Sequence, residues 1–243
     1  MLDKTVETRW KNNVIERQDL NSTNGELFSE FNKVFVSGRI EEDFEYSHRT
    51  FWKEYYRTRV RITRLSGTDD LVPIVVSNLV LSKEKIKKSL KGKWVEVAGQ
   101  FRSYNRLGED GRKHLDLFLY VTLINIYDNK EEMKEIENVN SIYLKGYLCK
   151  KPIYRITPLG SQITEVFIAV NRPNGESDYI PCITWDRDAK WSRKLEVGNQ
   201  VEIYGRIQSR KYFKRYSPDT DEGKYKETYE ISTMRIQKVW DFK

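Results

Sequence analysis

The chain carries one pattern of residues twice, and this repeat limits the possible fold more than any other feature of its sequence. Apolar residues and a glycine recur at every second position, first at Val34, Val36, Gly38 and Ile40 and again 108 residues later at Ile142, Leu144, Gly146 and Leu148. The offset relates Pro73 to Pro181 and becomes 106 at Gly99 and Gly205. Such self-similarity indicates an internal duplication in which each copy forms the same small domain.

Each copy shows the same order of predicted elements: two strands, a hairpin turn, a third strand, a short helix, a fourth strand, a long loop and a fifth strand. The first helix is expected at 82–91, with Ser82 as N-cap and Gly92 as stop, and the second at 187–195, with Trp191 and Leu195 on one face. A helix between the third and fourth of five strands is the order of the oligonucleotide-binding (OB) fold. We therefore predict an all-β protein of two tandem five-stranded OB-fold barrels.

The repeat divides the chain into four segments. Residues 1–32 are expected to form a polar N-terminal arm, 33–127 a first and more divergent OB domain, 128–140 an acidic linker, and 141–240 a second OB domain. The linker lacks glycine and proline, and one or two helical turns with Met133 and Ile136 inward are expected there.

The positive charge is divided equally between the two copies. Each carries 18 Lys and Arg against 12 Asp and Glu, in a chain with a net charge of +7 that is 33% charged and 13% aromatic. A basic surface of this kind is typical of a partner for a polyanion. No apolar run is long enough to span a membrane and the start has no apolar signal core, so we expect a soluble cytoplasmic protein, associated with the nucleoid, that makes no membrane contact.

Aromatic and basic side chains alternate in two stretches of the second copy. The stretch 171–185 reads NRPNGESDYIPCITW and the stretch 205–213 reads GRIQSRKYF. Flat rings stack on the exposed bases of a single strand while cations contact its phosphates, so this interleaving favours single-stranded nucleic acid. The expected contact residues are Phe167, Arg172, Tyr179, Trp185, Arg206, Arg210, Lys211, Tyr212, Phe213, Lys214 and Arg215.

The same two stretches resemble the OB domain of the bacterial and phage single-stranded DNA-binding protein (SSB) family, and the resemblance extends over residues 142–238. It implies that Tyr179, Trp185 and Tyr212 stack on bases and that Arg172, Arg206 and Arg210 meet phosphates. It also implies binding to single-stranded DNA in replication, recombination or repair, and a homodimer with four barrels. The family usually ends in a Gly/Pro/Gln-rich linker and an acidic tip, whereas this sequence ends with Trp240 to Lys243 directly after the last predicted strand, which puts recruitment of partner enzymes by that route in doubt.

The first copy has lost rings at the positions that correspond to those in the second. Leu71 stands in place of Tyr179, Ser77 in place of Trp185, and Arg106 in place of Tyr212. Three alternate arginines, Arg57, Arg59 and Arg61, form a cationic stripe that we expect to follow the nucleic-acid backbone, with Tyr104 as a stacking residue and Arg106 beside it. The alternative is a solvated strand face that is balanced by acidic residues nearby, Glu41, Glu42, Asp43 and Glu45.

Signals for catalysis or cofactor binding are absent from the sequence. It has no phosphate-binding Walker loop, no GxSxG, no HExxH and no dinucleotide-binding fingerprint, so we expect no enzyme activity, no cofactor and no metal. Cys149 and Cys182 are expected to be buried free thiols within strands. Two other functions stay open: a protein-interaction scaffold of a primosome or recombination complex, in which the rings form an interface, and a single-stranded RNA binder.

Overall fold

The computed structural model describes residues 30–108, 111–133, 138–215 and 222–240. The strands of the first copy are β1 (Asn32–Ile40), β2 (Glu45–Thr50), β3 (Lys53–Thr63), β4 (Asp69–Ser77), β5 (Trp94–Leu107) and β6 (Lys113–Tyr127). Those of the second are β7 (Asn140–Leu148), β8 (Ile153–Ile156), β9 (Gln162–Asn171), β10 (Ser177–Trp185), β11 (Gln200–Arg215) and β12 (Gly223–Lys238). The helices are α2 (Lys83–Ile86), η1 (Lys130–Glu132) and α3 (Asp186–Ser192).

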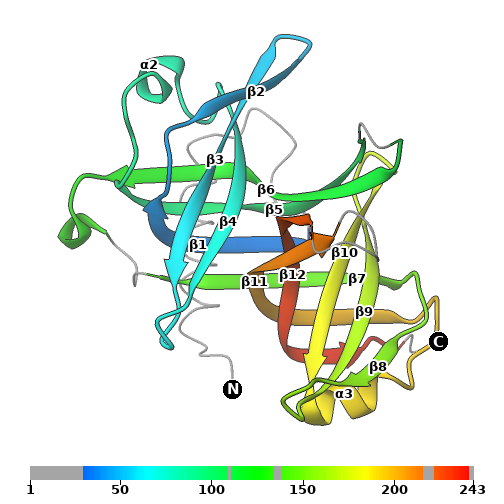
Figure 1. The fold of residues 1–243 in the computed structure, drawn as a ribbon. Helices are drawn as coiled ribbons and strands as arrows, with labels where there is room; N and C mark the ends of the chain where they lie inside the picture. The colour runs from blue at the N-terminus through cyan, green and yellow to red at the C-terminus, as the bar shows by residue number, and fades with distance from the viewer. Residues whose placement is uncertain (1–29, 109–110, 134–137, 216–221, 241–243) are drawn as a thin grey trace.

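Five strands of each copy close into a barrel (Figure 1). In the first, β1 pairs with β3, β3 with β4, β4 in parallel with β6, β6 with β5, and β5 again with β1. In the second, β7, β9, β10, β12 and β11 pair in the same cyclic order. This confirms two tandem OB-fold barrels. The short strands β2 and β8 are additional to the expected five, and each forms a hairpin with the strand that follows it.

The barrels are filled by the alternating apolar residues of the repeat. Val34 and Val36 are fully buried, and so are Ile142 and Leu144 at the equivalent positions of the second copy. The long fourth strand of each barrel bends at a bulge, between Ala98 and Gly99 in β5 and at the matching place in β11. A side chain on Gly99 would collide with the carbonyl oxygen of Tyr120, so the bend requires glycine.

Both helices between the third and fourth strands are shorter than expected. Ser82 is the N-cap of α2, and its carbonyl oxygen accepts the amides of Lys85 and Ile86, but the helix ends at Ile86 instead of continuing to residue 91. The reason lies in Asp43, whose carboxylate accepts the backbone amides of Leu90 and Lys91 at 2.8 and 3.0 Å. These bonds replace the helical ones that the amides of Leu90 and Lys91 would otherwise form.

The second helix ends at Ser192, three residues before the expected end. Leu195 is buried as predicted, whereas Trp191 is exposed and therefore does not share an inward face with it. Among the described residues, no helix is long and apolar enough to cross a membrane.

The linker is described in part. Its described residues form the single turn η1, within the one or two helical turns that were expected, and Met133 follows it in an extended conformation. Ile136 and the N-terminal arm up to residue 29 lie outside the described residues. Cys182 is buried in β10, whereas Cys149 is only partly buried and lies one residue beyond β7; both thiols are free. Burial raises the pKa of both cysteines.

The two barrels share a seam that the repeat did not predict. β1 pairs antiparallel with β7, from Asn32 opposite Leu144 to Val36 opposite Asn140, and so joins all twelve strands into one continuous sheet. Figure 1 shows the two barrels on either side of this seam.

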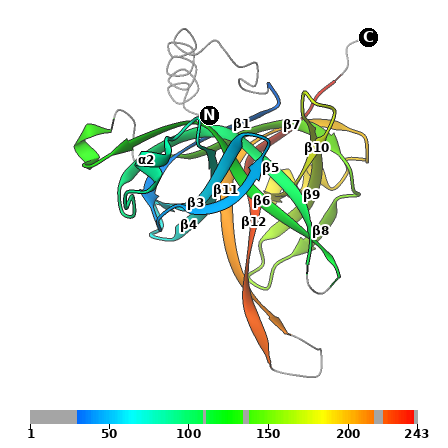
Figure 2. The ribbon, with the colours of Figure 1, turned by 90° about the horizontal axis from the view of Figure 1, so that it is seen from above.

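Two β-ribbons extend beyond the barrels (Figure 2). We call them the first arm, which is the β5–β6 ribbon from Ser103 to Asp116, and the second arm, which is the β11–β12 ribbon from Ser209 to Thr228. The second arm stays paired as far as Arg215 opposite Gly223, so part of the long loop that was expected between the fourth and fifth strands is strand instead. Residues 216–221 lie outside the described part of the chain.

Candidate nucleic-acid interface

The outer face of the second barrel carries a row of rings. Tyr179 of β10 pairs with Ala169 of β9, and Phe167 pairs with Pro181, so all four side chains lie on one face. The rings of Phe167 and Tyr179 are nearly parallel, with centroids 6.5 Å apart and planes at 20°. Tyr179 is 39% exposed, so its ring presents area to solvent instead of filling the core.

Two more residues complete this row, and the sequence analysis did not single them out. The ammonium group of Lys150 lies 4.3 Å from the centroid of the Phe167 ring, a cation–π contact. Tyr147 pairs with Ala169 from the other side and is exposed. Strand alternation could have identified Tyr147, because it stands between the inward residues Gly146 and Leu148. No comparable signal exists for Lys150, which follows the end of β7.

Trp185 lies at the far end of β10, about 20 Å from Tyr179 at the usual rise of a strand. It is 36% exposed, and its indole N–H donates to the hydroxyl of Ser232 at 3.2 Å. Ser232 pairs in turn with Arg206 of β11. The structure therefore brings Trp185 and Arg206 together at one end of the face, while Tyr179 marks the other.

Arg206 lies in an environment that is unfavourable for its positive charge. Its Nε atom is buried and has no hydrogen-bond acceptor among the described residues. The pKa of its guanidinium is lowered first by burial and then by the nearby positive charge of Arg64, against a smaller opposing effect of Asp70. A half-buried cation whose Nε atom finds no acceptor in the described part of the chain, and which lies near a second cation, is one that an anion would stabilise.

The remaining residues that were predicted to contact nucleic acid lie on two opposite sides of the second arm. Because side chains alternate along β11, Arg210 and Tyr212 share the side of Arg206, and Lys211, Phe213 and Arg215 take the other. On that other side the rings of Phe213 and Tyr225 meet edge to face, with centroids 5.2 Å apart. The side chain of Lys214 lies outside the described part of the structure.

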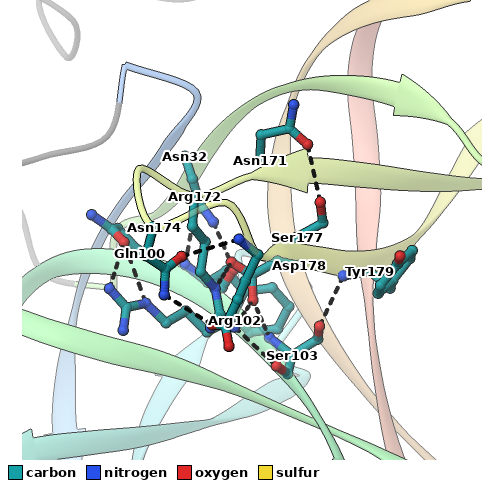
Figure 3. A network of polar contacts seen from close by, with 12 residues as sticks. Asn32, Gln100, Arg102, Ser103, Asn171, Arg172, Asn174, Ser177, Asp178 and Tyr179 are labelled. Carbon is teal, nitrogen blue, oxygen red and sulfur yellow. Dashed lines mark hydrogen bonds and ion pairs between the residues drawn. The ribbon is translucent and has the colours of Figure 1, made fainter.

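Arg172 does not lie on the open face (Figure 3). Its guanidinium binds the buried carboxylate of Asp178 at 2.9 Å through Nε and 2.5 Å through Nη2, and Nη1 binds Glu176 at 2.7 Å. Nη2 also donates to the carbonyl oxygen of Ser103, in the first arm, at 3.1 Å. The hydrogen bond to Asp178 raises the pKa of Arg172. The side chain is committed to contacts within the protein and is only 19% exposed.

These contacts belong to a pair of symmetric junctions between each barrel and the arm of the other. Asp178 accepts the amide of Ser103 at 2.7 Å, and the amide of Tyr179 donates to the Ser103 hydroxyl at 2.8 Å. At the equivalent positions, Asp70 binds Arg64 and accepts the amide of Ser209 at 3.1 Å, while the amide of Leu71 donates to the Ser209 hydroxyl. We call these two junctions the latch.

The three arginines of β3 project outward, as predicted, and each meets a carboxylate. Arg57 lies 3.4 Å from Glu45, Arg59 lies 2.5 Å from Glu42, and Arg61 lies 2.5 Å from Glu41. Arg59 also reaches Glu227 of the second arm at 3.4 Å. These are the acidic neighbours that the alternative interpretation named, so a polyanion would compete with the protein's own carboxylates for this stripe.

The predicted pair in the first arm lies apart from the stripe. Tyr104 is exposed, and Arg106 binds Asp116 across the arm at 2.9 Å. On the face of the first barrel, the rings of Tyr55 and Tyr120 lie 6.2 Å apart, and Arg102 packs 3.8 Å from the Tyr120 ring centroid. Tyr55 is buried, so this first face presents less free ring area than the second.

Within the ranges that the structure describes, no group of three or more His, Cys, Asp or Glu side chains is arranged to hold a metal ion. Carboxylates there are instead bound to arginines or to backbone amides, as Asp70, Asp178 and Asp43 are. The arrangement of the second face therefore offers ring stacking and cation contacts.

Comparison with known proteins finds a family that is similar to the second copy. Residues 139–239 match the Single-strand binding protein family. The single-stranded DNA-binding protein of Oceanobacillus iheyensis is 37% identical over 81 residues, which is 30% of this chain and 50% of that protein. Single-stranded DNA-binding protein A of Bacillus subtilis is 36% identical over 81 residues, or 47% of its length. The chain spans about half the length of these relatives.

A solved structure shares the architecture of both copies. A deletion variant of the single-stranded DNA binding protein from Thermus aquaticus aligns with 87% of this chain and 96% of its own, with a TM-score of 0.65 and 17% identity. At that identity the likeness describes the fold only. Through residues 139–239, the chain is therefore similar to the Single-strand binding protein family.

Proposed function

We propose that this protein binds single-stranded DNA with little sequence preference and protects it during replication, recombination or repair, in the cytoplasm and in association with the nucleoid. The observation that carries the proposal is the second outer face, where Tyr179 and Phe167 present parallel rings beside Lys150. Every base has a flat face, so stacking on these rings requires no particular sequence. The relatives bear the name single-stranded DNA-binding protein, which supports the choice of polymer.

The bases would follow β10 and the second arm. Trp185 and Tyr179 lie at the two ends of β10, and Tyr212 continues on the same side of β11 as Arg206 and Arg210. A single strand that passes along this line meets a ring at intervals and a cation between them. Each stacked base is typically worth ~1–3 kcal/mol, so two or three such contacts give binding that persists at moderate salt.

Intrinsic fluorescence during titration with oligo-dT at low and moderate salt tests this function. The expected result is quenching that persists at moderate salt, resists competition by duplex DNA, and is largely lost in the double variant Trp185→Ala, Tyr212→Ala. The matched control is Trp191→Ala, which removes an exposed tryptophan from α3 and should leave the affinity unchanged. Oligo-U as competitor measures the preference for DNA over RNA. Binding that modest salt abolishes and the double variant does not change would instead make the ring row a protein interface.

We also propose that two chains associate, giving four barrels. The seam between β1 and β7 leaves Phe35, Tyr143 and Tyr204 only partly buried on the face of the joined sheet, and the last two rings lie 4.9 Å apart. A second copy packed on this face would remove these rings from water. Mass photometry should find twice the mass of one chain, and a shift to single chains in Tyr143→Lys; a wild-type mass of one chain would contradict the assembly.

A further inference from the structure

The hairpin between β2 and β3 ends in two large aromatic side chains that point into solvent. Phe51 and Trp52 form the turn, and they are 89% and 62% exposed. Figure 1 shows this ribbon extending past the end of the first barrel. Two adjacent exposed rings are an unfavourable use of apolar surface unless something covers them.

The backbone at this turn also disfavours the residue that occupies it. Phe51 has a φ of 52°, in the left-handed region that glycine, asparagine and aspartate adopt most readily. The guanidinium of Arg49 donates to the Phe51 carbonyl oxygen at 2.9 Å and fixes the turn. A bulky residue in a conformation of this kind points to a role for its side chain.

Ring pairs across the two strands make the ribbon a rigid support. His48 and Tyr55 stack with centroids 4.6 Å apart and planes at 11°, and Tyr46 meets Tyr56 edge to face at 6.0 Å. Cross-strand aromatic pairs stabilise a hairpin. The backbone that carries the tip rings is therefore fixed before any ligand arrives, which lowers the entropic cost of binding.

The chemistry around the tip is cationic. The Lys53 ammonium group lies 5.3 Å from the Trp52 ring centroid, and residues 48–53, HRTFWK, contain no carboxylate. From Lys53 the strand β3 continues to Arg57 on the same side, about 13 Å along the chain at the usual rise of a strand. A ring pair followed by spaced cations suits a base followed by its phosphates.

We propose that Phe51 and Trp52 form a stacking site for an unpaired nucleobase, on the same DNA strand that the second outer face binds. This inference rests on the proposed function. The first barrel has Leu71 and Ser77 where the second has Tyr179 and Trp185, and it carries an exposed ring pair at this tip. The corresponding turn of the second barrel has Leu159 and Gly160, so the ring pair is a feature of the first barrel alone.

Two variants test the site. Trp52→Ala removes one ring, and Phe51→Asn removes the other while retaining a residue that tolerates positive φ. Leu65→Ala is the matched control, because Leu65 is fully exposed in the next hairpin of the same barrel, between β3 and β4. Affinities are measured for oligo-dT of ~8 nucleotides, which one OB fold can accommodate, and of ~35 nucleotides, which can reach both barrels.

The expected result is a loss of roughly 5- to 100-fold in affinity for the long oligonucleotide in each tip variant, with little change for the short one. The control should match the wild type for both. Long oligonucleotides that carry 5-iodouracil should crosslink to the tip, as mass spectrometry of the 48–53 peptide would show.

Two outcomes would overturn the site. Unchanged affinity for both lengths with no crosslink at the tip rejects base stacking there, and if the tip variants also lower the mass of the free protein, the rings join copies of this chain instead. Failure of the wild type to bind either oligonucleotide would reject the proposed function itself, and the site with it.

Discussion

At the scale of single residues, Arg206 shows how one side chain can favour the complex over the free protein. Its buried Nε atom lacks an acceptor among the described residues, and Arg64 lies close enough to lower its pKa. In the free protein this charge destabilises the fold. A phosphate near the guanidinium would remove that penalty, because it would supply both a negative charge and hydrogen-bond acceptors.

The variant Arg206→Gln tests whether this side chain lowers the stability of the free protein and raises the affinity for DNA. Glutamine is chosen because the first barrel has Gln100 at the equivalent position. We expect the free energy of unfolding of the free protein to rise by ~1 kcal/mol, because a partly buried and unpaired charge is removed. Affinity for oligo-dT should fall about 10- to 100-fold, by analogy with the loss of one charge-assisted hydrogen bond.

Urea unfolding and fluorescence titration measure the two effects. Arg187→Gln is the control, because its side chain is 97% exposed on α3. A variant that is less stable than the wild type when free would show that Arg206 has a partner within the protein.

Glu230 gives a prediction about pH. It is buried on β12, and burial raises its pKa, with the nearby Arg210 opposing and Glu165 reinforcing the shift. Arg155, which is bound to Glu165, and the amide of Gln208 also face it. A carboxyl group whose pKa is higher in the folded state stabilises the protein below its unfolded pKa, and that stability is lost as pH rises through the folded pKa.

Glu230→Gln should therefore raise the melting temperature at neutral pH, and the gain should shrink as pH falls toward 4, near the ordinary pKa of glutamate. Thermal melts monitored by circular dichroism between these limits would show the trend. Glu176→Gln is the control, because the Glu176 pKa is lowered and its variant should behave oppositely. A gain that is equal at both ends of the range would mean that the Glu230 pKa is not raised.

At the scale of elements, the latch gives Arg172, a predicted DNA contact, partners within the protein itself. The sequence placed Arg172 beside a hairpin of the family pattern, and that pattern alone does not reveal which cations are used internally. Asp178 stands only six residues further on, and Ser103 is contributed by the other copy. A contact across 69 residues leaves no local signal in the sequence.

Arg172→Ala should cost ~3–5 kcal/mol of unfolding free energy, because it leaves the buried Asp178 carboxylate without its cation. The slope of affinity against salt concentration should stay as in the wild type. The symmetric variant Arg64→Ala should show a similar loss, since Asp70 is equally buried. A stable Arg172→Ala protein with a reduced salt slope would restore Arg172 to the DNA-binding surface.

For the arginine stripe on β3 we expect the opposite result, namely a change in the slope of affinity against salt concentration. If Arg57 and Arg59 exchange their carboxylates for phosphates, the double variant to alanine should lower the salt slope by about 1.4, at ~0.7 for each phosphate contact on a single strand. Conversely, Glu42→Gln with Glu45→Gln should raise affinity at low salt, because it frees the same arginines.

Titrations at four or five salt concentrations give both slopes. Lys83→Ala is the control, because it also removes a cation that is paired with a carboxylate, Glu54, but at α2 and away from the stripe. An unchanged slope in the arginine variant would leave the stripe as a solvated face, as the alternative interpretation holds.

The elements themselves were largely predictable, and the reasons are local. Alternation along the strands and the repeat of 108 residues identified the five barrel strands of each copy, while Ser82 and Gly92 indicated the first helix. Its early end was not predictable, because Asp43 acts from 47 residues earlier in the chain. The extension of the second arm was missed because its polar residues, 211 to 215, resemble a loop when their partners in β12 are not known.

At the scale of the whole molecule, the seam and the latch make two barrels into one body. β1 pairs with β7, and each arm contacts the other barrel through Ser103 or Ser209. We therefore expect one cooperative unfolding transition for the chain. Far-ultraviolet circular dichroism and tryptophan fluorescence should give coincident curves in urea. Two separated transitions would mean that the barrels unfold independently.

The seam has an evolutionary consequence. In a symmetric dimer of identical single-barrel chains, every substitution appears on both halves, so neither half can specialise alone. Here the latch has remained the same in both halves, with Arg64 and Asp70 matched by Arg172 and Asp178, while the outer faces have diverged at Leu71 and Tyr179. Covalent linkage of the halves thus frees each face to acquire mutations of its own, under the single restriction that the contact between them is preserved.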